Sequence, residues 1–216
     1  MRAVFAALCV AAVAAGAAFA AAGEKEQIHF TKADQAAAKR AVATRSDLGS
    51  GNWTGGYSRP DLSQSASCAN FHPKQADLVV TGAAESDWTD QGLQLETIAQ
   101  VLKTRAMVAA DWRRTILANG AVPCLRSHLL KELGKGVTLV SFRRTIFAPV
   151  ATNAQAFLMI VDVKTNTGTV RVAIEFVAIA QGRTELTIVS IVQNAVQKVV
   201  AQIDAQIARE LVARAT

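Results

Sequence analysis

Residues that could do chemistry are few and widely spaced in this chain. It has three histidines, His29, His72 and His128. The sequence contains no Gly-x-Ser-x-Gly nucleophile motif, glycine-rich phosphate loop, His-Glu-x-x-His motif or Cys-x-x-Cys pair. We therefore expect no enzymatic activity, no cofactor and no metal ion.

One constellation leaves an enzymatic alternative open. His72 lies four residues after Cys68, and His128 lies four residues after Cys124. A bond between the two cysteines would bring the imidazoles toward each other, where a carboxylate such as Asp111 could complete a hydrolase or metal site. Surface histidines are the ordinary alternative, and we prefer it.

A second candidate is a carboxylate group near Trp88. Glu85, Asp87 and Asp90 fall within six residues, where we expect a turn. Carboxylate oxygens suit Ca²⁺, but neither the ligand spacing nor the glycine of a known calcium loop is present. A solvated turn explains these residues better.

Four aromatic side chains are the candidates for ligand contacts. Aromatic residues make up only 6% of the chain, yet Trp53, Tyr57 and Phe71 lie in an irregular segment and Trp88 lies in the expected turn. Loops on a rigid scaffold often carry binding surfaces, and such rings suit apolar or glycan ligands. The ordinary alternative is that the rings cover a sheet edge beneath a long loop.

The N-terminus predicts export. Residues 1–22, MRAVFAALCVAAVAAGAAFAAA, have one basic residue followed by an apolar, alanine-rich run, which is typical of a secretory signal peptide. A membrane anchor is the alternative, but the run barely reaches the roughly 20 residues of a spanning helix. We expect a secreted, extracytoplasmic protein with one domain over residues 23–216 and no stable membrane span after cleavage.

Cysteine usage agrees with that compartment. Cys68 and Cys124 remain after the signal peptide, and a disulfide is the default for an even number in an oxidising environment. Two buried thiols are the alternative.

The charge excludes one class of partner. The net charge is +6, and removing Arg2 leaves +5, from 22 basic and 17 acidic residues. These charges are scattered and form no basic run with interleaved aromatics, so we expect no nucleic-acid binding. The partner is expected to be a small apolar or envelope ligand, or a protein.

The candidates must be positioned by a sheet. Between Val137 and Val192 four β-branched and aromatic runs alternate with short polar turns, which predicts an antiparallel meander of four strands. Helices are expected at Lys32–Leu48, with Thr31 as its N-cap, and at Thr104–Ala118, Pro123–Leu133 and Asn194–Arg214. Further strands are expected at Asp77–Trp88 and Gly92–Leu102, with a short one at Trp53–Tyr57. This order predicts an α+β fold: an antiparallel sheet of six or seven strands with helices on its faces, an α/β/α sandwich.

The last helix has one apolar stripe. Its members are Val196, Val199/Val200, Ile203, Ile207 and Leu211. Gln, Lys, Asp, Arg and Glu make up the opposite face, which predicts an amphipathic helix packed on the sheet. A membrane-surface helix is the alternative, but the charges are mixed in sign rather than cationic.

Several short segments carry a family resemblance. They are Asp34-Gln35-Ala36 with Ala41-Val42 and Asp47-Leu48, Gly51-Asn52-Trp53, Cys68, Asp77 to Gly82, and Pro123-Cys124-Leu125. With them the chain resembles a group of exported actinobacterial-type proteins. It is similar in element order to the extracytoplasmic sensor domains of mycobacterial serine/threonine kinases, and more distantly to the Mog1/PsbP-like sandwich.

The chain departs from that pattern in two ways. Gly-Ser-Gly-Asn stands where the family often has Pro before Gly-Trp, and two mature cysteines stand where the kinase sensors have more. The resemblance implies a secreted, non-enzymatic binding or sensor-like domain for a small amphiphile, a cell-envelope component or a protein partner. An exported hydrolase and a structural envelope protein are the alternatives.

Overall fold

The computed structural model describes residues 25–62, 68, 70–193 and 197–215. The predicted signal peptide, residues 1–22, and Val196 of the predicted apolar stripe lie outside this part. No helix among the described residues is both long and apolar enough to cross a membrane.

An eight-stranded sheet forms the centre of the fold, with strand order β1-β3-β4-β8-β7-β6-β5 and with β2 paired to β3. Its strands are β1 (Gln27–Ile28), β2 (Thr54–Ser58), β3 (Val79–Asp90), β4 (Leu93–Leu102), β5 (Val137–Thr145), β6 (Asn153–Thr165), β7 (Gly168–Gln181) and β8 (Thr184–Gln193). The predicted meander is confirmed as β5–β6–β7–β8. The expected six or seven strands omitted β1, which is parallel to β3 and makes the sheet mixed. Strand β1 has only two residues, which is too short to show the alternation that predicts a strand.

Four helices flank the sheet in the described part of the chain. They are α2 (Lys32–Arg40), α3 (Arg105–Asp111), α4 (Ala121–Glu132) and α5 (Gln197–Arg214). A 3₁₀ turn, η2 (Arg45–Leu48), follows α2, and α3 continues into a π-helical turn, η3 (Trp112–Ile116).

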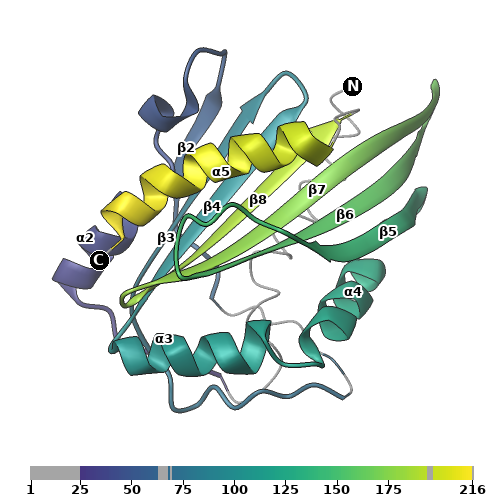
Figure 1. Cartoon of the computed structure of the whole chain (residues 1–216). Helices are drawn as coiled ribbons and strands as arrows, with labels where there is room; N and C mark the ends of the chain where they lie inside the picture. Colours follow the sequence, from purple (N-terminus) through teal and green to yellow (C-terminus); the bar gives the residue numbers. More distant parts are fainter. Residues whose placement is uncertain (1–24, 63–67, 69, 194–196, 216) are drawn as a thin grey trace.

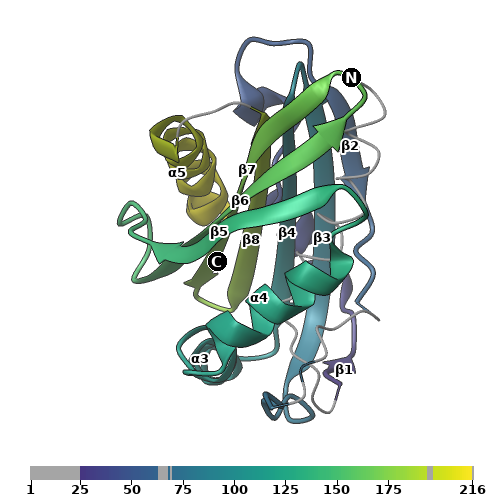
Figure 2. The ribbon, with the colours of Figure 1, turned by 90° about the vertical axis from the view of Figure 1, so that its right-hand side faces the viewer.

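The helices cover both faces, as the sandwich prediction requires (Figures 1 and 2). Successive side chains of β7 alternate between the two faces. Val177 and Ile179 pack in one core with α2 and with Leu211 of α5. Phe176 packs in a second core with Leu129 of α4, and Ala178 and Ala180 pack against α3 in a third. Strand β7 is therefore buried on both faces.

The first helix is shorter than predicted. It ends at Arg40, whereas the alanine-rich sequence predicted a helix to Leu48. Ala43 turns into the core, and its N–H donates to Thr97 Oγ1 at 2.8 Å, so this amide is lost to the helix. The Thr44 N–H then donates to Asp47 Oδ2 at 2.7 Å and begins a separate turn. A tertiary contact therefore overrides helix propensity here.

The start of α2 is fixed by close contacts. The Thr31 side chain accepts from the Asp34 N–H, as predicted for an N-cap. Asp34 also accepts from Arg183 Nη2 at 2.6 Å, in the turn between β7 and β8. A Cβ placed on Gly82 of β3 would lie 2.3 Å from the Asp34 carbonyl oxygen, so the helix approaches the strand at a position where only glycine fits.

The face of α5 differs from the prediction at one residue. Ile207 and Leu211 are buried as predicted, but Asp204, assigned to the polar face, is 0% exposed. It accepts a hydrogen bond from the Ser190 hydroxyl of β8. It also lies beside Glu175 of β7, so that a bond between the two carboxyl groups requires a proton on one of them. Asp204 lies one helical turn before the buried Ala208 and therefore on the same buried side of α5. The sequence pattern assigned it to the polar face because its side chain is charged.

Burial followed by this carboxyl pairing raises the pKa of Asp204, and burial raises the pKa of Glu175. The folded protein therefore binds more protons than the unfolded chain above the ordinary carboxyl pKa of about 4, and the free energy of unfolding falls as pH rises through this window. We expect Asp204→Asn to reduce that fall. Urea unfolding at about pH 5 and about pH 8 measures it. An equal fall in both proteins would contradict the shared proton.

Candidate functional site

The four candidate aromatic residues do not meet at one place. Trp53 is half-buried and packs against the core under α5. Tyr57 is 48% exposed on β2, with Lys39 Nζ 4.6 Å from its ring centroid. Trp88 lies within β3 rather than in a turn, and its Nε1–H donates to the Ala43 carbonyl at 3.1 Å in the core. Phe71 lies near the disulfide.

Trp53 contributes to a cavity of about 180 Å³ between α5, the η2 turn and the end of the β3–β4 hairpin. Its apolar wall contains Trp53, Leu95 and Ile207, and the last two are fully buried. The complete lining is Asp47, Leu48, Ser50, Trp53, Asp90, Leu93, Leu95, Ile203, Gln206 and Ile207. The cavity is therefore mainly apolar, with two carboxylates at its edge.

These two carboxylates differ in their partners. Asp47 Oδ2 accepts from the Thr44 N–H and from Arg214 Nη2 at 2.9 Å. Burial opposes these hydrogen bonds, but they hold the pKa of Asp47 below its ordinary value. Asp90 Oδ1 is buried and has no hydrogen-bond partner. A buried carboxylate oxygen without a hydrogen bond lowers the stability of the folded state. A hydrogen-bond donor on a ligand could therefore pair with Asp90 Oδ1.

Asp90 does not belong with Glu85 and Asp87, contrary to the grouping expected from the sequence. Alternation along β3 directs Trp88 and Asp90 to the α2/α5 face, and it directs Glu85 and Asp87 to the opposite face. Glu85 and Asp87 are half-buried within the strand rather than in a solvated turn. Turn prediction alone missed this separation, because strand β3 extends to Asp90.

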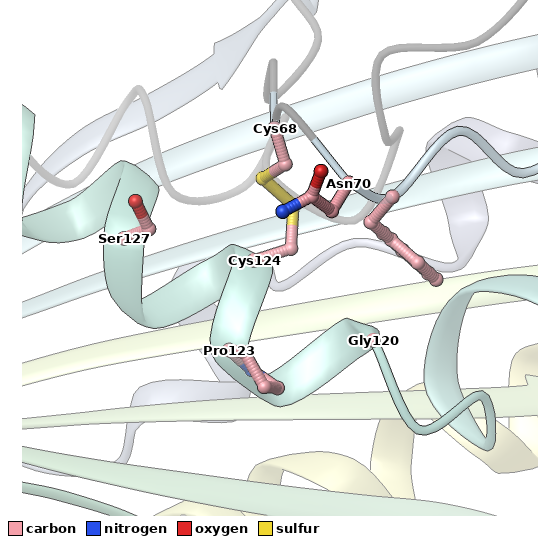
Figure 3. A pocket seen from close by; sticks show the side chains of 7 residues that line it. Cys68, Asn70, Gly120, Pro123, Cys124 and Ser127 are labelled. Carbon is pink, nitrogen blue, oxygen red and sulfur yellow. A yellow bond between two sulfur atoms is a disulfide. The ribbon is translucent and has the colours of Figure 1, made fainter.

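The second cavity, of about 220 Å³, lies beside the disulfide (Figure 3). Cys68 and Cys124 form the bond expected from the cysteine count, with Cα atoms 5.5 Å apart. Phe71 packs so closely that a Cβ on Gly120 would lie 2.5 Å from its ring. This contact and the disulfide attach the segment around Cys68 to the start of α4.

We expect Cys68→Ser/Cys124→Ser to lower the free energy of unfolding by about 4 kcal/mol, because the bond closes a long loop in the unfolded chain. Urea unfolding of oxidised and reduced protein measures the change. Intact-mass counting of free thiols is the control for the oxidised state. Equal stability of the two forms would contradict a structural role.

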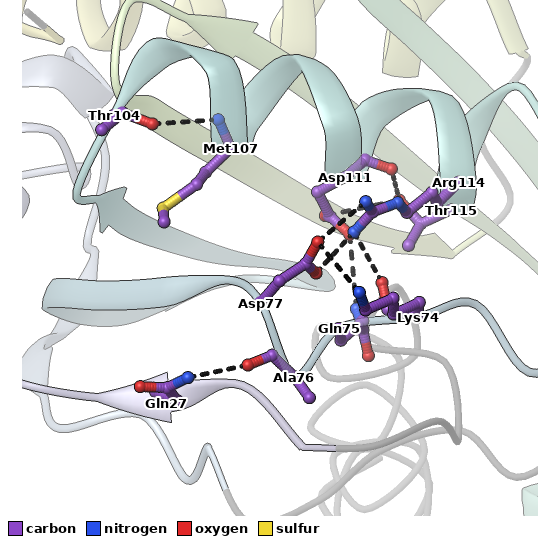
Figure 4. Close-up of polar contacts among 10 residues, drawn as sticks. All are labelled: Gln27, Lys74, Gln75, Ala76, Asp77, Thr104, Met107, Asp111, Arg114 and Thr115. Atoms are coloured by element: carbon purple, nitrogen blue, oxygen red, sulfur yellow. Dashed lines mark hydrogen bonds and ion pairs between the residues drawn. The ribbon is translucent and has the colours of Figure 1, made fainter.

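The alternative hydrolase or metal site was predicted around His72, His128 and Asp111. Neither His72, His128 nor Asp111 belongs to a group of three metal-ligating side chains in the part of the chain that is described. Asp111 instead accepts from Gln75 Nε2 at 3.3 Å and from the Thr115 hydroxyl (Figure 4). The bond from Gln75 attaches the segment before β3 to α3.

Arg114 completes this loop attachment (Figure 4). Its guanidinium donates to both oxygens of Asp77, at 2.7 and 3.0 Å, and to the Lys74 carbonyl at 2.8 Å. Burial raises the pKa of the neighbouring Asp111 to about 6 despite hydrogen bonds that lower it. Burial, followed by the charge of Asp111, raises the pKa of Glu26 to about 7. The hydrogen bonds from Arg114 to Lys74 and Asp77 fix the segment that leads into β3.

The chain matches no protein-family model, and no curated protein is similar to it in sequence. Among solved structures it is similar to the extracellular domain of PknH from Mycobacterium tuberculosis, with a TM-score of 0.45 and 8% identity. The match covers 82% of this chain and 95% of that chain. A likeness of this size indicates no ligand or partner. Membership of an exported actinobacterial-type family stays a prediction.

Proposed function

We propose that this protein is an extracytoplasmic, non-enzymatic binding domain whose cavity beneath α5 receives a small amphiphile. The observation that carries the proposal is the unpartnered, buried Oδ1 of Asp90 at the edge of a mainly apolar cavity. The predicted signal peptide and the disulfide support the compartment.

The size of the cavity limits the ligand. Drug-sized molecules occupy pockets of about 300–1,000 Å³, whereas an apolar cavity of about 150 Å³ admits benzene. A volume of about 180 Å³ therefore suits a small ring or the first carbons of an alkyl chain. The rest of a larger envelope molecule would lie outside, over the exposed Ser50 and Gln206.

The charge of the cavity selects the head group. Asp47 is already paired with Arg214, so Asp90 is the carboxylate left to bind a ligand. A cationic or N–H-donating group would pair with Asp90 while the apolar portion contacts Trp53 and Leu95. An anionic head would meet two carboxylates and be repelled.

Binding fits this site better than catalysis. Among the described residues, the cavity lining includes no histidine, cysteine or lysine that could act as a nucleophile or base. The lining can hold and orient a molecule but offers no acid–base pair.

We expect decyltrimethylammonium to bind more tightly than decyl maltoside, which has the same alkyl chain without the positive charge. Isothermal titration below micelle formation measures both. Asp90→Asn should weaken decyltrimethylammonium binding about tenfold, which corresponds to the loss of about 1.4 kcal/mol of attraction between the Asp90 carboxylate and the cationic head. Trp53→Ala should weaken both amphiphiles, because the ring forms part of the apolar wall.

Phe71→Ala is the matched control, since this ring lies at the disulfide and outside the cavity. It should leave both affinities unchanged. Equal binding of the two amphiphiles, or unchanged binding in Asp90→Asn and Trp53→Ala, would overturn the proposal. Effects confined to Phe71→Ala would move the site to the disulfide cavity.

A further inference from the structure

A group of acidic side chains lies on the sheet face opposite the amphiphile cavity. The β3–β4 hairpin places Asp87 directly opposite Glu96, and Glu85 lies two residues from Asp87 on the same face. One ligand oxygen from each of these three carboxylates lies within 4.8 Å of the other two. Ser58 of β2 stands opposite Glu85 in the register. We call these four residues the carboxylate cluster.

Glu96 forms the buried end of this cluster. Its side chain is 1% exposed, and neither carboxylate oxygen has a hydrogen-bond partner. Glu85 and Asp87 are half-buried beside it and lead toward solvent. Buried polar atoms in native proteins almost always have partners, so two free oxygens on one buried carboxylate indicate that a group is to be bound there.

The surrounding charges increase the need for a cation. Like charges directly opposite on neighbouring strands are destabilising, and Asp87 faces Glu96 in this way. None of the ion pairs between described residues involves the cluster, while the charge of Asp61 adds to the field at Glu85. Burial, followed by the charges of Asp87 and Glu85, raises the pKa of Glu96 to about 9.

Ser58 does not satisfy this charge. Its hydroxyl lies 3.0 Å from Glu85 Oε1 and 3.2 Å from Asp87 Oδ2, and it has one proton to donate. Glu96 receives nothing from it. A metal ion between the carboxylates would be bound by all three, and the Ser58 oxygen could then act as a further neutral ligand.

We propose that Glu85, Asp87 and Glu96, with the Ser58 hydroxyl, form a binding site for one hard divalent cation, with calcium preferred. The site lies across β2, β3 and β4, and cation binding holds these three strands together at the edge of the sheet. Water molecules complete the coordination on the exposed side.

The donor set selects the kind of metal. All the ligands are oxygens, which suit Ca²⁺, Mg²⁺ and Mn²⁺, whereas Zn²⁺ sites usually have nitrogen or sulfur ligands. Mg²⁺ requires near-ideal octahedral geometry with short bonds and loses its water reluctantly. Ca²⁺ accepts irregular arrangements of six to eight oxygens, which suits carboxylates projecting from a fixed strand register.

This site is independent of the amphiphile cavity. Asp90 and the cluster lie on opposite faces of β3, and none of the four cluster residues lines the cavity. Loss of one site therefore leaves the other in place, and the two proposals fail separately.

Isothermal titration of the EDTA-treated protein with CaCl₂ tests the proposal. We expect one Ca²⁺ per chain, with a dissociation constant of about 10⁻⁴ to 10⁻³ M, the range of extracellular calcium modules. CaCl₂ should also raise the Tm saturably, because the ion binds the folded state alone. MgCl₂ at equal concentration should give a smaller rise, and NaCl at equal ionic strength should give none.

Glu96→Gln should abolish both the heat of binding and the calcium-dependent rise in Tm, while the variant folds and has an unchanged or higher Tm in EDTA. Asp87→Asn is the second variant, in case the buried position tolerates no change. Asp162→Asn is the matched control, because this carboxylate is paired with Arg171 elsewhere on the sheet. It should keep the full calcium response.

Two results would overturn the site. One is a wild-type Tm that responds to CaCl₂ no more than to NaCl, which would leave the cluster as carboxyl groups that share protons. The other is a calcium response that persists in both Glu96→Gln and Asp87→Asn, which would place the ion elsewhere. Unchanged decyltrimethylammonium binding in Glu96→Gln would show that the amphiphile site is intact.

Discussion

The pairing of β4 with β8 is the contact on which the rest of the structure depends. It joins the β3–β4 hairpin to the C-terminal meander through a continuous register from Leu93↔Val192 to Val101↔Thr184. Without it, the hairpin and the meander would be separate sheets with open edges. Because β4 and β8 are largely buried, this pairing also sets which side chains enter each core. Both candidate sites use residues of the hairpin that it holds in place.

Buried carboxyl groups then divide the molecule into chemically different regions. Asp204 and Glu175 lie beside each other under α5, and a bond between their carboxyl groups requires a shared proton. Asp90 Oδ1 is unpaired at the edge of a mainly apolar cavity, which favours a molecule with a donor group. Glu96 is unpaired among other carboxylates, which favours a cation. The same functional group therefore has three roles, and its neighbours determine which one applies.

Much of the framework could be predicted from local patterns. The four-strand meander, the β3–β4 hairpin, the Thr31 cap and the helices on both faces follow from alternation, turn residues and apolar stripes. The cross-strand position of Asp87 and Glu96 was also readable, because both lie the same distance from the Gln91-Gly92 turn. Asp87 was instead grouped with Asp90 by proximity in the chain, because the strand was expected to end at Trp88.

The sequence by itself determined the α+β class, the order of the main elements and the scarcity of catalytic motifs, since these depend on residue type and short-range spacing. Only the tertiary structure decided that α2 ends at Arg40, that Asp204 is buried and that Trp53, alone of the four aromatic candidates, lines the cavity beneath α5. Each of these depends on groups distant in sequence, such as Thr97 for Ala43 and Ser190 for Asp204. Local periodicity carries no information about such partners, because burial and hydrogen bonding are fixed when the strands pair.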